Sequence, residues 1–228
     1  NYESSKYLVE EFLEGHEISI EAFIHSGEFH YYCFAVRDIE SISNGKIIEH
    51  GSISDPLYDD TNLNEVKKVF EVACLALGIE EGPVKGDVLY TNSGPSILEV
   101  ASRSAPLAPL ISGRIYGTDM VSIHIKWVLD QDFVFKPLPV EFSKSKPVSH
   151  RILLHEPGTL KGIGGIDEAK NSKGVLEVVV LKDLKFPMIL DYPDNSNRIL
   201  YVAATGSDAL KARKNADDAL SKIKLFYK

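Results

Sequence analysis

The stretch that decides the fold runs from Val84 to Ala101 and reads Val-Lys-Gly-Asp-Val-Leu-Tyr-Thr-Asn-Ser-Gly-Pro-Ser-Ile-Leu-Glu-Val-Ala. Two apolar runs flank an Asn-Ser-Gly-Pro segment, and these are the residue types that a tight turn favours. The pattern predicts two antiparallel strands joined by that turn. Asp87 and Glu99 stand at equal distances from Ser93 along the chain, so we expect them to face each other across the hairpin.

Two carboxylates in this arrangement suit a metal ion. Directly opposite residues of antiparallel strands share a face, with Cβ atoms about 4.5–5.5 Å apart. Such carboxylates repel each other unless a cation lies between them. Mg²⁺ or Mn²⁺ prefers hard oxygen ligands and often completes its shell with substrate phosphates and water. Asp87 and Glu99 are therefore the predicted metal ligands, and the alternative is a pair of solvated acids on an ordinary hairpin.

The composition is that of a globular protein with one large or two small domains, since 44% of the 228 residues are hydrophobic. A net charge of −8 argues against nucleic acid as the main partner, because phosphate backbones are bound through Lys and Arg. No long apolar run or signal-like start is present, so we expect no membrane span. Cys33 and Cys74 resemble the small buried hydrophobes of a reducing compartment, which favours a cytoplasmic location.

Residue spacing predicts the elements on either side of the hairpin. We expect strands at 7–13, 17–25, 28–37 and 45–52, a helix at 62–78, and a helix capped by Thr118 or Asp119. Segments 136–139 and 143–147 are linker-like, and strands follow at 150–155, 174–181 and 198–205. Gly162 to Gly165 is expected to form a turn. Ser207-Asp208 caps a last helix with inward residues at Leu210, Ala216, Ala219, Leu220 and Ile223.

Four blocks of sequence occur in a recognisable order. They are Tyr7-Leu-Val-Glu-Glu-Phe-Leu-Glu-Gly-His-Glu17 with Ile18-Ser-Ile-Glu21, then Gly82-Pro-Val-Lys-Gly-Asp87, Ile97-Leu-Glu-Val-Ala-Ser-Arg103 and Gly113-Arg-Ile-Tyr-Gly-Thr-Asp119. Together they resemble the second half of the ATP-grasp superfamily of carboxylate–amine and carboxylate–thiol ligases. The amino-acid ligase and carbamoyl-phosphate-synthase-like or biotin-carboxylase-like branch is the most similar.

The resemblance implies an α+β fold. Residues 1–146 would form the carboxyl-terminal part of the ATP-grasp domain, an antiparallel sheet with helices on one face. Residues 147–228 would form a smaller β-rich closing domain of the biotin-carboxylase type. The implied reaction activates a carboxylate with ATP and Mg²⁺ or Mn²⁺ as an acyl phosphate, which an amine captures with release of ADP and phosphate. Neither substrate can be named from the sequence, and a homodimer is compatible with it.

The segment from Val9 to Leu13 has features of an adenine site. A hinge between strand and loop can present a backbone C=O and N–H side by side to the adenine edge, with apolar side chains along the ring. A carboxylate at Glu17 can accept from both ribose hydroxyls. By resemblance, the nucleotide-binding positions are Glu10 and Glu11 at the adenine edge, Phe12 and Leu13 at the ring, and Glu17 at the ribose. The alternative is an amphipathic edge strand with surface glutamates.

Two cations accompany the acid pair. Lys85 lies two residues before Asp87, so both point to one face of a strand. A cation there can neutralise charge that develops on a transferring phosphoryl group. By resemblance, Lys85 is the basic catalytic residue, and Arg103 holds the acyl phosphate or substrate carboxylate through its forked guanidinium. The alternative is that each cation forms an ion pair with one of the two acids.

The chain also departs from the family pattern. Ala101 replaces an asparagine that ligates metal in much of the family, which leaves the metal stoichiometry open. Ser104-Ala105 replaces a glycine pair, and no Gly-rich phosphate loop with two lysines precedes the adenine segment. We therefore expect a fragment of a longer ligase, whose missing amino-terminal half would be a partner and without which the chain would be inactive. A non-catalytic nucleotide-binding or scaffold module, favoured by Ala101, and a biotin-type carboxylase remain alternatives.

Overall fold

The structure, a computed structural model, describes residues 9–41, 47–54, 60–105, 113, 119–130, 133–134, 146–154, 157–182, 188–190, 195 and 198–228. Its strands are β1 (His16–His25), β2 (Glu28–Ser41), β3 (Ile47–Ser54), β4 (Gly82–Thr91), β5 (Gly94–Ala101), β6 (Val148–Leu153), β7 (Gly158–Gly164), β8 (Val175–Val180), β9 (Met188–Leu190), β10 (Leu200–Thr205) and β11 (Lys224–Tyr227). Its helices are α1 (Asp60–Ala76), α3 (Met120–Leu129), α4 (Ile166–Lys170) and α5 (Ala209–Leu220).

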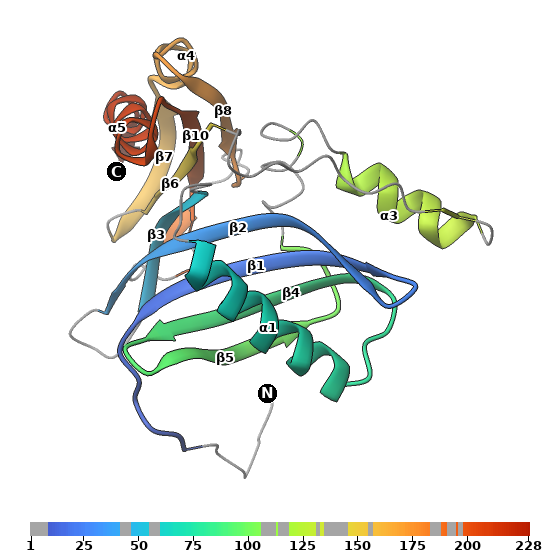
Figure 1. Ribbon diagram of the computed structural model, residues 1–228. Coiled ribbons are helices and arrows are strands. Elements are labelled where there is room, and N and C mark those ends of the chain that lie inside the picture. Colours follow the sequence, from blue (N-terminus) through green and yellow to red (C-terminus); the bar gives the residue numbers. More distant parts are fainter. Residues whose placement is uncertain are drawn as a thin grey trace.

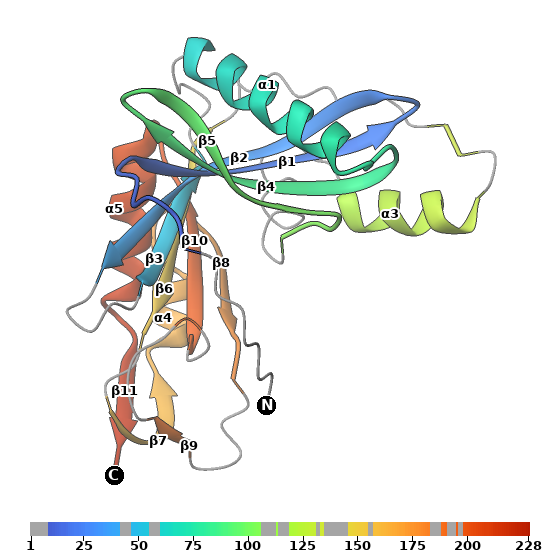
Figure 2. The ribbon, with the colours of Figure 1, turned by 90° about the horizontal axis from the view of Figure 1, so that it is seen from below.

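One long antiparallel sheet organises the molecule. Its eight strands follow the order β5-β4-β1-β2-β3-β6-β10-β8, and β11, β7 and β9 form a smaller sheet. Helix α1 lies across β1, β4 and β5 (Figure 1). Strands β3, β6, β10 and β8 run in a different direction, with α5 along their side (Figure 2). The α+β class with a large antiparallel sheet, predicted from the sequence, is confirmed.

Alternation along β1 separates two faces of the sheet. Ile18, Ile20 and Ile24 are buried beneath α1, where they pack with residues such as Phe70. Phe23 points to the other face and packs edge-on against Trp127 of α3, with ring centroids 5.4 Å apart. The odd-numbered polar residues of β1 therefore lie on the face opposite α1, because successive side chains of a strand alternate.

The hairpin that decides the fold forms as predicted. Strands β4 and β5 pair from Thr91↔Gly94 to Lys85↔Ala101, and Asp87 lies opposite Glu99. Gly78, with a φ of 72°, ends the preceding helical segment in the left-handed conformation that glycine adopts without strain. The helix itself covers 60–76, close to the predicted 62–78.

The long sheet continues across the predicted boundary between residues 146 and 147. Strand β3 pairs with β6 from Gly51↔Arg151 to Ser54↔Val148. A second link is ionic, because Asp38 of β2 forms ion pairs with Arg151 of β6 and with Arg213 of α5. The division into 1–146 and 147–228 stays a prediction. The two parts are linked by the pairing of β3 with β6 and by these ion pairs.

Three local predictions are wrong. Residues 9–13 form no strand, and residues 7–8 lie outside the described part. Val9 and Phe12 are exposed there, so no neighbouring strand or core holds this segment extended. Leu210 does not face inward but is 80% exposed, because the buried stripe of α5 is Ala212, Ala216 and Ala219 and Leu210 falls on the far side.

The third wrong prediction is the turn at Gly162 to Gly165. Residues 158–164 form β7, which pairs with β11 and β9, and Gly165 caps α4. The glycines weaken the strand signal but do not prevent pairing when partners lie on both sides. The predicted linker-like segments 136–139 and 143–147 lie outside the described residues, except for residues 146 and 147. Within the described part of the chain, no helix is long and apolar enough to cross a membrane.

Candidate functional site

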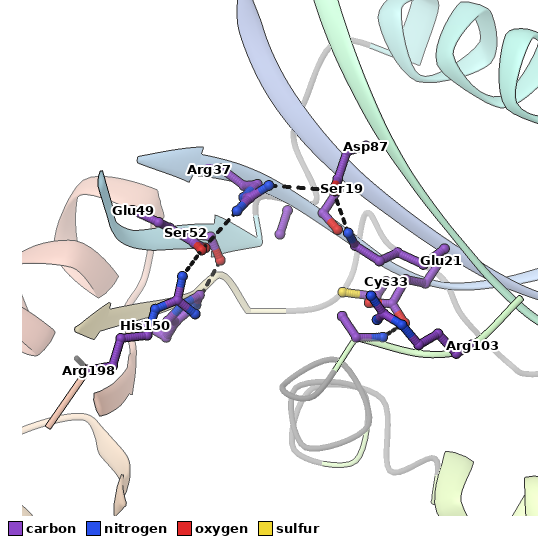
Figure 3. Close-up of a pocket in the computed structure, with 13 residues that line it drawn as sticks. Ser19, Glu21, Cys33, Arg37, Glu49, Ser52, Asp87, Arg103, His150 and Arg198 are labelled. Atoms are coloured by element: carbon purple, nitrogen blue, oxygen red, sulfur yellow. Dashed lines mark hydrogen bonds and ion pairs between the residues drawn. The ribbon is translucent and has the colours of Figure 1, made fainter. Parts of the chain in front are cut away.

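A cavity of about 220 Å³ lies on the sheet face opposite α1, where the two directions of the long sheet meet. Strands β1, β2, β3, β4 and β6 all contribute to its wall, as do the segments that follow β5 and precede β10. The lining is rich in charge, and residues from far apart in the chain point toward one another (Figure 3). We call this cavity the charged cavity.

Arg37 is the centre of the charge network in this cavity. Its Nη1 donates to Glu17 Oε1 and lies 3.5 Å from Asp87 Oδ2, and its Nη2 donates to Glu49 Oε2 at 2.9 Å. Arg198 Nη2 binds the same Glu49 oxygen at 2.6 Å. One guanidinium therefore joins carboxylates from β1, β3 and β4. Figure 3 shows its contacts with Asp87 and Glu49.

These contacts shift the pKa values of the carboxylates in opposite directions. Burial and the charge of nearby Asp87 raise the pKa of Glu17 although Arg37 opposes the shift. Burial by itself would raise the pKa of Glu49, but the hydrogen bond from Arg37 and the charge of Arg198 lower it. Glu49 is therefore firmly ionised, while Glu17 holds its charge less strongly.

The two predicted metal ligands, Asp87 and Glu99, are directly opposite in the β4–β5 pairing but differ in burial. Asp87 is buried, and its Oδ2 accepts a hydrogen bond from Lys85 Nζ. Its Oδ1 is also buried and has no hydrogen-bond partner among the described residues. Glu99, directly opposite, has a side chain that is 55% exposed and does not line the charged cavity.

This donor set fits a divalent cation that takes part of its shell from a ligand. Two carboxylates with one unsatisfied buried oxygen suit Mg²⁺, which usually binds one or two carboxylates together with phosphate oxygens and water. Among the described residues, no cluster of three or more acidic, His or Cys side chains is arranged to hold a metal by itself. Asp87 and Glu99 could therefore hold Mg²⁺ only with help from a bound ligand.

Arg103 lies at the rim of the charged cavity. Its side chain is 59% exposed, its Nη1 donates to the Ser104 carbonyl at 3.3 Å, and its Nη2 lies 3.9 Å from Glu99 Oε1. The two ion pairs of the alternative interpretation, Lys85 with Asp87 and Arg103 with Glu99, are thus both present. The second is long and exposed, so it holds Arg103 only weakly.

A second cavity of about 830 Å³ adjoins the first, and we call it the open cavity. Its wall includes every residue that the sequence assigns to the nucleotide, namely Glu10, Glu11, Phe12, Leu13 and Glu17. Residues of β2, β3, β4 and β5 also contribute to the wall. The nucleotide positions thus gather in one cavity, and the two catalytic positions and Asp87 gather in the other.

Four charged residues of the charged cavity were not predicted from the sequence as site residues: Glu21, Arg37, Glu49 and Arg198. Glu21 Oε2 accepts from Tyr32 Oη at 2.9 Å and from the Ala105 N–H at 3.1 Å. Burial raises the pKa of Glu21 to about 7. Its position in the Ile18-Ser-Ile-Glu21 block was the only sequence signal for it, and the other three carried none.

His150 also lines the charged cavity and was expected only as a strand residue. Its Nδ1 lies 2.8 Å from Ser52 Oγ across the β3–β6 pairing. Burial lowers the pKa of His150 to about 4, so its ring is neutral at physiological pH. The part of the chain after residue 147 therefore supplies both His150 and Arg198 to this cavity.

Comparison with known proteins agrees with this architecture. Residues 151–228 match the model of the family described as L-amino acid ligase C-terminal domain 2. The crystal structure of an L-amino acid ligase from Bacillus licheniformis superposes with a TM-score of 0.78 at 18% identity, over 95% of this chain and 55% of that chain. Phosphoribosylglycinamide synthetase from Anaerococcus prevotii gives a TM-score of 0.73 at 18% identity, over 96% and 55% of the respective chains.

A third similar structure is the biotin carboxylase domain of the Hydrogenobacter thermophilus 2-oxoglutarate carboxylase, solved with MgADP and bicarbonate. Its TM-score is 0.69 at 12% identity, and the alignment covers 95% of this chain and 47% of that chain. The chain thus spans about half the length of these solved structures. No curated protein matches the sequence. The chain therefore has the fold that its sequence predicts, that of the ATP-grasp ligases, and its residues 151–228 match L-amino acid ligase C-terminal domain 2.

Proposed function

We propose that this chain is the part of an ATP-dependent carboxylate–amine ligase that holds the nucleotide and the metal. The parent reaction converts a carboxylate to an acyl phosphate with the γ-phosphate of ATP, and an amine then displaces phosphate to form an amide. The observation that carries the proposal is the adjacency of the two cavities. The open cavity collects the predicted adenine and ribose residues, and the charged cavity collects Lys85, Asp87 and Arg103.

The roles follow from the chemistry of each side chain. Phe12 and Leu13 provide apolar contact for the adenine ring, with the backbone and the acids at 10 and 11 along its edge. Glu17 accepts from the ribose hydroxyls. Mg²⁺, held by Asp87 and Glu99 with phosphate oxygens, would neutralise charge on the phosphates.

Lys85 and Arg103 act where negative charge increases during the reaction. Phosphoryl transfer requires little covalent chemistry from the protein, so positioning and electrostatic stabilisation dominate. Lys85 is beside Asp87 in the charged cavity, and both side chains are largely buried. There Lys85 can face the transferring phosphoryl group. Arg103 is at the exposed rim, where a carboxylate substrate would enter, and its fork matches either a carboxylate or an acyl phosphate.

The proposal is tested by nucleotide binding to this chain. We expect isothermal titration calorimetry to detect MgADP binding, and we expect Glu17→Gln to weaken it. Glu40→Gln is the matched control, since Glu40 is an exposed glutamate that pairs with His50 and lines neither cavity. An absence of MgADP and MgATP binding at millimolar concentrations would reject the proposal.

Ligation itself is proposed for a longer protein, because the chain spans about half the length of its structural neighbours. The chain by itself should release little phosphate from ATP when any of the standard amino acids is supplied. Robust ATP-dependent phosphate release by these residues alone would contradict the fragment hypothesis.

A non-catalytic nucleotide-binding module is the second candidate, and Ala101 favours it because alanine cannot ligate metal. The retention of Lys85, Asp87, Glu99 and Arg103 favours the ligase, since a scaffold does not require this set. The two functions differ in one measurable way. A ligase parent hydrolyses or transfers the γ-phosphate in the presence of its acid substrate, whereas a scaffold binds ATP and leaves it intact.

A further inference from the structure

Arg37 is the only described residue that lines both the open and the charged cavity. It lies on β2, where it pairs with Ser52 of β3, and its side chain is largely buried. Any ligand that extends from one cavity into the other must therefore pass its guanidinium. This position is decided by the fold, because β2 lies between β1 and β3 in the sheet.

Three carboxylates hold the guanidinium in place. Glu17 of β1 and Asp87 of β4 both face Nη1, and Glu49 of β3 binds Nη2. Burial disfavours the charge, but the hydrogen bond and charge of Glu49, with Glu17 and Asp87, raise the pKa of Arg37 above its ordinary value. The group is therefore a fixed and permanent cation at the boundary between the cavities.

We propose that Arg37 binds a phosphate group of the nucleotide and is the residue by which the site distinguishes nucleotides from nucleosides. The inference rests on the proposed function, which places the sugar at Glu17 and the transferred phosphoryl group at Asp87. The phosphates connect those two points, and Arg37 touches both residues. A guanidinium is suited to this task because its planar fork can donate to a phosphate oxygen from one nitrogen while the other nitrogen stays on a carboxylate.

The two terminal nitrogens of the guanidinium, Nη1 and Nη2, have different roles. Glu17 and Asp87, which share Nη1, each gain another partner when nucleotide binds: ribose hydroxyls for Glu17 and the metal for Asp87. Lys85 also remains beside Asp87 as a second cation. Nη1 is therefore the nitrogen that donates a hydrogen bond to a phosphate oxygen when the nucleotide binds. Nη2 stays on Glu49, which Arg198 and the Asn195 side chain anchor from the other part of the chain.

Glu49 is thus a positioning residue for Arg37. It accepts from Arg37 and from Arg198 through the same oxygen, Oε2. Its backbone N–H donates to Asn195 Oδ1 at 3.0 Å. These contacts come from opposite sides, so the carboxylate keeps Nη2 in place while the phosphate occupies Nη1.

The test compares adenosine with ADP, both in the presence of Mg²⁺, by calorimetry on the intact chain. Arg37→Gln is expected to weaken ADP binding by about tenfold or more, the usual effect of a lost charge-assisted hydrogen bond, with adenosine affinity changed by about twofold at most. Arg37→Lys keeps the charge without the fork and should lie between wild type and Arg37→Gln. Arg213→Gln, which removes another Arg–carboxylate pair but lines neither cavity, is expected to bind both ligands like wild type.

A double variant separates a direct contact from net charge. Arg37→Gln with Glu49→Gln restores the total charge of the cavity, and ADP binding should remain weak. Recovery of wild-type ADP affinity in the double variant would overturn the inference, as would unchanged ADP affinity in Arg37→Gln. If wild type bound ADP and adenosine but Arg37→Gln weakened both equally, the role would be structural and the inference wrong. If wild type bound neither ligand, the proposed function would fail as well.

Discussion

Asp87 and Glu99 are register partners across the β4–β5 hairpin, but the Asp87 side chain is only 8% exposed and the Glu99 side chain is 55% exposed. The difference arises because β4 is flanked by β1 and β5, whereas β5 is the last strand of the sheet. One acid is therefore fixed among cations inside the charged cavity, and the other is free to turn toward a ligand at its rim. A metal shared between them would lie at the boundary between protein and solvent.

Metal binding should depend on nucleotide. The pair offers two carboxylates, and Lys85 already occupies Asp87 Oδ2, so Mn²⁺ alone should bind weakly. Adding ADP supplies phosphate oxygens and should tighten Mn²⁺ binding, as followed by electron paramagnetic resonance of the free ion. Glu99→Gln should remove most of this enhancement. Equal Mn²⁺ affinity with and without ADP would argue against the metal assignment.

In a complete ligase that contains this chain, substitutions at Arg103 and Glu99 should affect ATP binding and turnover to different extents. Arg103→Ala removes an exposed oxyanion partner that is needed mainly as charge builds, so kcat should fall by about 10²–10³-fold with little change in the KM for ATP. Glu99→Gln should lower ATP affinity modestly and reduce turnover strongly. Steady-state phosphate release with a matched acid and amine measures both effects. Near-wild-type turnover in Arg103→Ala would assign Arg103 a structural role and favour the scaffold alternative.

The buried Glu21 should make stability depend on pH. Burial raises its pKa from 4.5 to about 7, so the folded protein holds this proton more tightly than the unfolded chain. Its stabilising contribution is complete below the unfolded pKa and is lost as the pH rises through 7. Glu21→Gln keeps the shape and can still accept from Tyr32 and Ala105. It should therefore be more stable than wild type by up to about 3 kcal/mol at pH 8, and should lose this advantage near pH 4.

Urea unfolding at several pH values checks this difference. Glu80→Gln is the control, because it removes a carboxyl group from an exposed position. A stability difference between wild type and Glu21→Gln that did not change between pH 4 and pH 8 would show that folding leaves the pKa of Glu21 unshifted, and would contradict the prediction.

Gly51 should be intolerant of a side chain. Its φ is +148°, and a Cβ atom would overlap the backbone carbonyl of His150 on the paired strand β6. Gly51→Ala should destabilise the protein by several kcal/mol, since neither backbone can move without breaking the pairing. Gly162→Ala is the matched control, because its Cβ would meet only Phe226 at 3.8 Å. Thermal unfolding of the two variants side by side checks the prediction.

Much of the fold could be predicted because its signals are local. The alternation of Ile18, Ile20 and Ile24 predicts β1, and the turn residues after Tyr90 predict the hairpin and its register. A cap at Thr118 or Asp119 predicts the start of α3, and in the structure the Asp119 side chain accepts from the Ser122 N–H. Strand β7 was missed because its glycines carry no periodic signal and its pairing depends on distant partners.

Fewer of the site residues than of the strands and helices could be predicted from the sequence. Lys85, Asp87 and Glu99 could be found because all three belong to one hairpin. Arg37 could not, because its partners come from three different strands and its importance arises only from their order in the sheet. Arg198 and His150 reach the same cavity from beyond residue 147 through the β3–β6 pairing, which no local pattern indicates.

Because β3 and β6 meet along a short run of paired residues, the chain has a natural place to be split. A cut between Val134 and Lys146 would give two pieces, each with an unpaired strand edge that matches the edge of the other. The ion pairs of Asp38 with Arg151 and Arg213, and of Glu49 with Arg198, would favour the correct register over self-association. Two separately produced pieces should therefore recombine without a covalent link and restore the charged cavity, as in enzyme complementation.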